Sequence, residues 1–143
     1  MSTWANIYFK TTDKLERLGM PVLIFIIRYV IAKIFFLSGL TKISNWPGTV
    51  ALFTQDYKVP LLSPEIAAYL AASAELICPI LLILGLGTRF AALALLIMTA
   101  VIQYTYPGYI EHTFWALLLI TIIFYGAGKF SLDYHIKKKY YTK

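Results

Sequence analysis

The sequence predicts an all-α integral membrane protein, a four-helix bundle with both termini in the cytoplasm. Apolar residues make up 59% of its 143 residues and charged residues only 14%, against about 25% charged residues in an ordinary soluble domain. Four long apolar stretches have the length of membrane-spanning helices, and basic residues are unequally distributed between the segments that flank them. The short chain indicates a single domain that covers residues 1–143.

This composition excludes several classes of protein. A soluble enzyme, a disordered tail or a soluble helical bundle needs more polar sequence to cover its surface than this chain provides. The net charge of +6 does not indicate nucleic-acid binding, because the basic residues lie mainly near the two ends of the chain. The single cysteine, Cys78, excludes an internal disulfide and a cysteine-based zinc site. We therefore expect contact with the lipid bilayer and no nucleic-acid partner.

Each apolar stretch has about the 17–25 residues that cross a hydrocarbon core of about 30 Å, although the fourth needs help from its flanking residues. The four expected spans are residues 20–40, 66–86, 90–106 and 113–126, the last extended to 128. Ser63 and Pro64 precede the second span and provide a helix cap and a first helical turn. We expect a long loop at residues 41–62 and a short loop at residues 107–112.

The distribution of lysine and arginine predicts the orientation of the spans. One side of the membrane would hold only Lys42 and Lys58. The other would hold Lys10, Lys14, Arg17, Arg89, Lys129, Lys137, Lys138, Lys139 and Lys143. Because the more basic side faces the cytoplasm, both termini are expected there and the two loops outside.

Three ionisable residues lie within the expected spans, where each needs a partner because a bare charge at the bilayer centre costs about 2.5–3.5 kcal/mol. At 1.5 Å per residue, Arg28 lies about 12 Å and Lys33 about 20 Å from the cytoplasmic end of the first span. Glu75, on the second span, lies about 16 Å from the same side. We therefore expect Glu75 to pair with Arg28 or Lys33, on a helix face rich in alanine.

Both the expected pair and His112 have a structural and a functional interpretation. The pair either locks two helices together or forms a proton or quinone-headgroup site with a buried carboxylate. His112, beside Glu111 and facing the loop that contains Asp56, either shuttles protons or bonds to a neighbouring loop at the start of its helix. One histidine near one or two carboxylates does not predict a metal site.

Several stretches together resemble one family. These are residues 36–42 (FLSGLTK), 57–62 (YKVPLL), 72–76 (ASAEL), 84–89 (LGLGTR), 112–115 (HTFW) and 126–133 (GAGKFSLD). With Arg28, they resemble in order the DoxX family of small four-helix membrane proteins. The resemblance implies that the family's polar positions are Arg28, Lys42, Glu75, Arg89, His112, Trp115 and Asp133. Two residues depart from the pattern: Ala127 stands where the family has proline, and Lys33 is not a family position.

The resemblance also implies a function. The family takes its name from a relative in a thiosulfate:quinone oxidoreductase, and other members resemble membrane partners of redox or oxidative-stress enzymes. We expect an accessory subunit of a redox, oxidative-stress or metal-stress system in the bacterial cytoplasmic membrane. Its cofactor would be either a quinone or a group held by a partner, and its partner another protein or a second copy of the chain. Residues 57–65 and 128–133 most resemble a subgroup encoded beside enzymes that modify copper-binding peptides. The alternatives are a small transporter or export component and a scaffold that recruits a soluble enzyme.

The expected orientation is testable with reporter fusions. A reporter fused after Lys143 should report a cytoplasmic location, and one inserted near Thr54 should report the exterior, because basic residues flank the cytoplasmic ends of the spans. Two reporters on the same side, or the opposite pattern, would refute the orientation.

Overall fold

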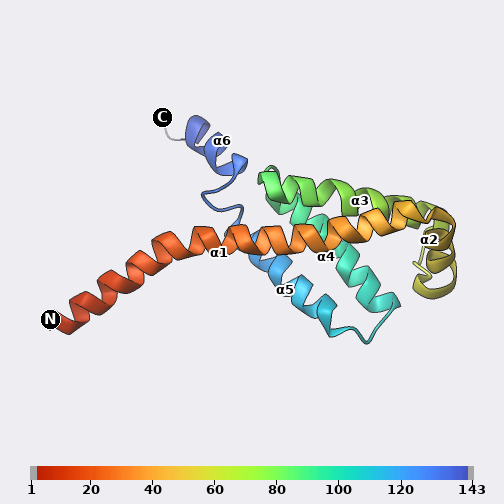
Figure 1. Cartoon of the computed structure of the whole chain (residues 1–143), viewed down its shortest axis with the longest axis horizontal. Coiled ribbons are helices and arrows are strands. Elements are labelled where there is room, and N and C mark those ends of the chain that lie inside the picture. The colour runs from red at the N-terminus through yellow and green to blue at the C-terminus, as the bar shows by residue number, and fades with distance from the viewer. Residues whose placement is uncertain (1–2, 142–143) are drawn as a thin grey trace.

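The computed structural model describes residues 3–141, and this part of the chain is helical with no strand. Its elements are α1 (Thr3–Ser44), α2 (Trp46–Leu52), the π-helical turn η1 (Phe53–Tyr57), α3 (Pro64–Leu84), α4 (Thr88–Thr105), α5 (Ile110–Tyr125) and α6 (Leu132–Tyr141). Helices α1, α3, α4 and α5 pack into a bundle (Figure 1), which confirms the expected all-α fold, while the orientation of the termini stays a prediction. Helices α1, α3 and α4 are long and apolar enough to cross a membrane, whereas α5 is apolar but has 16 residues.

The first helix is longer than expected. Instead of starting near residue 20, α1 is one continuous helix of 42 residues that contains Pro21. Residues 3–18 contain no glycine or proline, so nothing in the sequence stops the helix before the span. The N-terminal part of α1 therefore projects beyond the bundle (Figure 1).

The segment expected as a long loop at residues 41–62 is largely helical, so that expectation was wrong. Helix α1 continues to Ser44, and α2 begins after Asn45, whose side chain accepts a hydrogen bond from the backbone N–H of Gly48. The π-helical turn η1 then folds back onto α3, where Phe53 is buried against Ala67 and Ala68. This apolar contact is the reason that the segment does not remain an open loop.

Helices α1 and α3 pack closely along their length because small residues line the contact. A side-chain carbon at Gly39 would lie 3.0 Å from Leu76 and 3.1 Å from Cβ of Glu75, so the two backbones could not approach this closely with a larger residue. Ala68 and Ala72 of α3 are also buried. The expected small-residue face of α3 is confirmed, and Glu75 lies on it.

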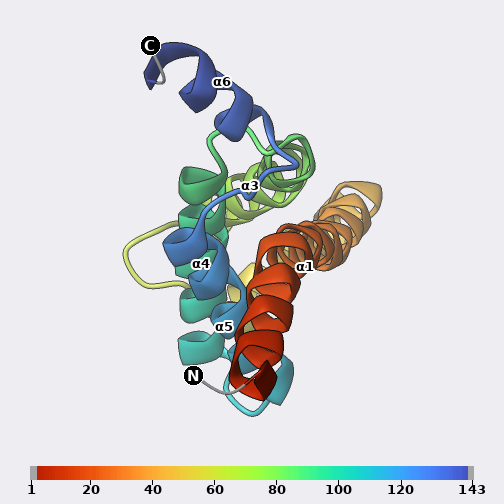
Figure 2. The same ribbon diagram turned by 90° about the vertical axis from the view of Figure 1, so that its left-hand side faces the viewer.

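The bundle has two ends. The terminal end contains the turn between α3 and α4 together with α6, which lies beside that turn (Figures 1 and 2). The loop end contains α2, η1 and the turn between α4 and α5.

Arg28 joins three segments at the terminal end. Its Nε and Nη2 donate to the carbonyls of Leu82 (2.7 Å) and Ile83 (2.8 Å), and its Nη1 donates to those of Ala127 (2.6 Å) and Phe130 (2.8 Å). We call these four acceptors the carbonyl cage. The last carbonyls of a helix have no partner within it, and the helix dipole favours a cation there. Arg28 is 1% exposed, so this buried guanidinium ties α1 to the end of α3 and to the segment before α6.

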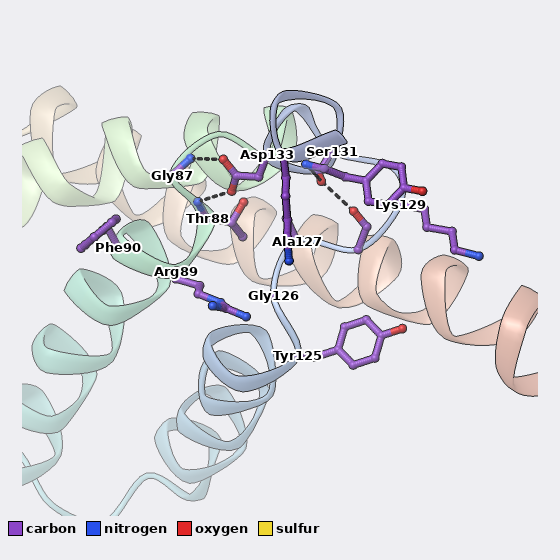
Figure 3. Close-up of a pocket in the computed structure, with 13 residues that line it drawn as sticks. Gly87, Thr88, Arg89, Phe90, Tyr125, Gly126, Ala127, Lys129, Ser131 and Asp133 are labelled. Carbon is purple, nitrogen blue, oxygen red and sulfur yellow. Dashed lines mark hydrogen bonds between the residues drawn. The ribbon is translucent and has the colours of Figure 1, made fainter. Parts of the chain in front are cut away.

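Asp133 caps α4 from another part of the chain. Helix α4 begins after Gly87, which has no side chain to cap it. The carboxylate of Asp133 accepts hydrogen bonds from the backbone N–H groups of Gly87 (2.8 Å) and Thr88 (2.9 Å), as Figure 3 shows. Its own backbone N–H donates to the carbonyl of Gly85. These bonds hold α6 against the turn between α3 and α4.

Gly85 and Gly87 provide a matched test of the terminal end. Both have positive φ (+68° and +56°), so alanine at either site costs about 1–2 kcal/mol of backbone strain. At Gly85 the new methyl group would also collide with Ser131 and lie 2.6 Å from Nη2 of Arg28, whereas at Gly87 it would meet nothing within 4 Å. We expect Gly85→Ala to lower the unfolding temperature in detergent several times more than Gly87→Ala. Equal effects would show that contact with Arg28 does not restrict this turn.

Candidate functional site

A buried ion pair between α1 and α3 is the centre of the candidate site. Nζ of Lys42 lies 2.7 Å from Oε2 and 2.8 Å from Oε1 of Glu75. Ser38 accepts a hydrogen bond from Lys42 (2.9 Å) and donates one to Oε1 of Glu75 (3.3 Å). Glu75 is 2% exposed and Lys42 is 9% exposed, so the two charges stabilise each other away from water.

One oxygen of this pair keeps unused hydrogen-bonding capacity. The 2.7 Å contact between Lys42 and Oε2 of Glu75 lacks hydrogen-bond geometry, and among residues 3–141 Oε2 receives no hydrogen bond. A buried carboxylate oxygen normally accepts at least one. The ammonium of Lys42 is therefore its partner in the ion pair, and Oε2 accepts no further hydrogen bond within residues 3–141.

The expected pairing of Glu75 with Arg28 or Lys33 was wrong. The height estimate placed the cytoplasmic end of the first span at residue 20, but Arg28 itself lies level with the end of α3, where it binds Ile83. Lys42 was expected outside the span, yet α1 continues to Ser44 and keeps it on the helix, where its side chain meets Glu75. Lys33 is exposed and lines a groove between α1 and α3.

Aromatic side chains connect the loop end to the centre of the bundle. Ring contacts with centroid distances between 5.1 and 5.9 Å run in the order Phe53, Tyr57, Tyr106, Tyr109, His112, Trp115 and Phe35. His112 lies within this series, and its Nδ1 is hydrogen-bonded to Oε1 of Gln103 at 3.0 Å. Its hydrogen-bonding partner is thus on α4 and not in the segment that contains Asp56. Within the described residues no group of three histidine, cysteine or acidic side chains is placed to hold a metal ion.

A cleft of about 300 Å³ lies between α3 and α4 beneath η1, and we call it the lateral cleft. Its walls include Ala71 and Ala74 of α3, which are close in sequence to Glu75, and Ala94 and Met98 of α4. Its other lining residues are also almost all apolar. Two of them, Leu70 and Ile97, are 57% and 58% exposed, so the cleft opens sideways toward the position of the lipid.

Tyr57 is an aromatic residue with a hydroxyl group that lines the lateral cleft. Burial raises the pKa of this phenol, and the negative charge of Glu75 raises it further, with smaller effects from Tyr106, Asp56 and Tyr109. Tyr57 therefore remains protonated at neutral pH, and a protonated phenol is able to donate a hydrogen bond.

The candidate residues lie in three parts of the bundle. Arg28, Arg89 and Asp133 lie at the terminal end, where Arg28 and Asp133 hold backbone groups. Lys42 and Glu75 pair deeper in the bundle, and Trp115 contacts both His112 and Phe35 toward the loop end.

The sequence profile of the DoxX family matches residues 23–108 of the chain. The chain belongs to the DoxX family. The matched DoxX residues contain four of the candidates and precede His112, Trp115 and Asp133. An uncharacterized protein of Haemophilus influenzae is 37% identical over 145 residues, in an alignment that covers 91% of this chain and 93% of that protein. No solved structure matches the chain. The DoxX fold and membrane character expected from the sequence are thereby supported, while the subgroup stays a prediction.

Sequence analysis did not single out Ser38, Tyr57 or Gln103 in this DoxX protein. Ser38 precedes Lys42 by four residues, so helical spacing alone places both on one face. Tyr57 follows Phe53 by four residues, and this apolar spacing in a segment taken for a loop was the available signal.

A double-mutant cycle tests the ion pair. Glu75→Gln and Lys42→Met should each lower the free energy of unfolding in detergent by about 3–5 kcal/mol, because each leaves one buried charge without a partner. The double variant should lose clearly less than the sum. As a control, Glu75→Gln combined with Arg28→Gln should be additive, because Arg28 binds the carbonyl cage and not the carboxylate. Additive losses for Lys42 and Glu75 would contradict the pairing.

Proposed function

We propose that this DoxX protein is a membrane-embedded accessory subunit of a redox or stress-response system and binds a quinone in the lateral cleft. The observation that carries this proposal is an apolar cleft with a protonated phenol, Tyr57, next to the buried pair of Lys42 and Glu75. The relative from Haemophilus influenzae supports a bacterial protein, and we place it in the cytoplasmic membrane as part of this proposal.

The lateral cleft fits the chemistry of a quinone. Ligand sites are mostly apolar, with a few polar groups that orient the ligand, and start at about 300 Å³. The alanines of α3 and α4 leave space for a flat ring, and the exposed rim of Leu70 and Ile97 gives a lipid-soluble molecule access from the side. Tyr57 would donate a hydrogen bond to a quinone carbonyl oxygen.

The ion pair would serve proton handling. Reduction of a quinone to a quinol takes up two electrons and two protons, and we assign the electrons to a partner protein. Glu75 is buried beside the alanines of the cleft wall, and its Oε2 has no hydrogen bond within the described residues. Lys42 would hold the carboxylate in place and compensate its charge.

Binding of a short-chain ubiquinone to the purified protein in lipid nanodiscs tests the proposal. Tyr57→Phe should weaken binding about tenfold, because one hydrogen bond contributes about 1–1.5 kcal/mol and 1.4 kcal/mol is tenfold. The ring contacts of Tyr57 with Phe53 and Tyr106 remain possible in that variant. Quenching of intrinsic fluorescence, with a matched titration of a quinone-free lipid, gives the affinity.

Two further variants distinguish the cleft from the rest of the surface. Ala94→Phe should fill the lateral cleft and abolish binding, whereas Ala100→Phe, at an exposed position of the same helix outside the cleft, should not. Thermal unfolding checks that both variants are folded. Wild-type protein that binds no quinone, or equal binding by the two alanine variants, would refute the quinone site and leave the transporter and the scaffold as the remaining functions.

A further inference from the structure

A second hollow, at the terminal end, combines positive charge with a position at the edge of the bundle. This terminal pocket has a volume of about 500 Å³ and lies between the start of α4, the end of α5 and α6 (Figure 3). Three cations line it: Arg89 from the first turn of α4, Lys129 from the segment before α6, and Lys137 from α6. The terminal pocket shares no lining residue with the lateral cleft, so ligand binding there does not depend on the proposed quinone site.

These cations have no anionic partner within the described residues. Asp133 also lines the terminal pocket, but its two oxygens accept the N–H groups of Gly87 and Thr88. No carboxylate lies within 4 Å of Arg89, Lys129 or Lys137 in residues 3–141, where the ion pair at Glu75 is the one salt bridge. Clustered cations repel one another, so an anion in the pocket would relieve a real electrostatic cost.

The backbone keeps the terminal pocket open. Figure 3 shows Arg89 extending toward Gly126, which has φ +90°. A side-chain carbon at Gly126 would lie 3.3 Å from Nη2 of Arg89 and would narrow the pocket beside the guanidinium. The wall also contains Thr88, a fully buried residue whose hydroxyl has no hydrogen-bond partner among the described residues. The pocket wall thus contains a guanidinium, which matches a phosphate group.

Exposed aromatic side chains surround these cations. Phe90 is 82% exposed and Tyr125 is 44% exposed, and both line the terminal pocket. Phe130, 58% exposed, is next to Lys129 in the chain. Aromatic residues beside cations, where spanning helices end, are typical of the membrane interface, and basic pockets between such helices bind lipid headgroups.

We propose that the terminal pocket binds the phosphate group of an anionic phospholipid, with Arg89 and Lys137 as its principal ligands. Lys129 contributes less, because it also lines a neighbouring hollow with Asp13 and Glu16. The exposed ring of Phe90 would contact the acyl chains. An anionic lipid, and not a soluble phosphate, is the occupant that this combination of cations and exposed apolar rings favours.

Titration of the detergent-solubilised protein with phosphatidylglycerol, followed by its unfolding temperature, tests the pocket. Phosphatidylglycerol should raise this temperature and phosphatidylcholine should not. Lys137→Gln should raise the lipid concentration needed for half of the effect about fivefold, since one basic residue contributes about 1 kcal/mol to binding an anionic surface. Lys138→Gln, with the same charge change on α6 but outside the pocket, should change it less than twofold.

Arg89 provides a second, independent measurement. Arg89→Gln should weaken the lipid effect at least as much as Lys137→Gln, and Arg89→Lys should restore part of it, because lysine keeps the charge but not the forked geometry. Circular dichroism checks that both variants are folded. Equal losses from Lys137→Gln and Lys138→Gln, or equal stabilisation by the two lipids, would overturn the proposal. So would inorganic phosphate at equal concentration if it stabilised the protein as much as the lipid does.

Discussion

The buried guanidinium of Arg28 is the constraint on which the terminal end of the bundle depends. A membrane protein must satisfy every backbone polar group from within, because lipid offers no hydrogen bonds. The last carbonyls of α3 and those of the segment after α5 face inward here, and one arginine serves four of them. Arg28 therefore caps the C-terminal end of α3 and also satisfies two carbonyls of the segment between α5 and α6. Its charge is compensated by carbonyl dipoles, with Asp133 as the nearby carboxylate.

The buried polar residues of the bundle therefore fall into two groups, those that bind backbone groups and those that bind each other. Arg28 and Asp133 both bind backbone groups and fix where α3 ends, α4 begins and α6 rests. Lys42 and Glu75 bind each other through side chains and leave one oxygen without a hydrogen bond in the described residues.

The sequence allowed the fold class and most of the helices to be predicted, because local signals mark their ends. Ser63 and Pro64 start α3, Gly85 ends it, and Pro107 follows α4, so these spans were predicted to within a few residues. Helix α1 has no such signal at its start, and the helical turns between Trp46 and Tyr57 form because Phe53 packs on α3, a contact made only in the folded chain. Helix α6 was not expected either.

The site was harder to predict than the fold. Glu75 was correctly placed on a protein-facing surface because alanines surround it in helical spacing. Its partner was misidentified because the height estimate depended on the span boundaries, and an error of eight residues shifts a helical side chain by about 12 Å. The partners of Arg28 are backbone carbonyls, which every residue has, so no pattern of side chains distinguishes them.

The depth of the Lys42–Glu75 pair has an electrical consequence. Lys42 and Glu75 carry opposite charges, so the pair as a whole has no net charge that the voltage across the membrane could move. A proton that reaches Glu75 from either surface, however, crosses part of the membrane's electric field. The free energy of one elementary charge changes by about 2.3 kcal/mol per 100 mV when it crosses the whole membrane. A proton that binds at Glu75 crosses only part of the membrane, so its free energy changes by the corresponding fraction of this value. Under the proposed proton handling, the occupancy of this carboxylate by a proton would therefore depend on the voltage across the membrane as well as on pH.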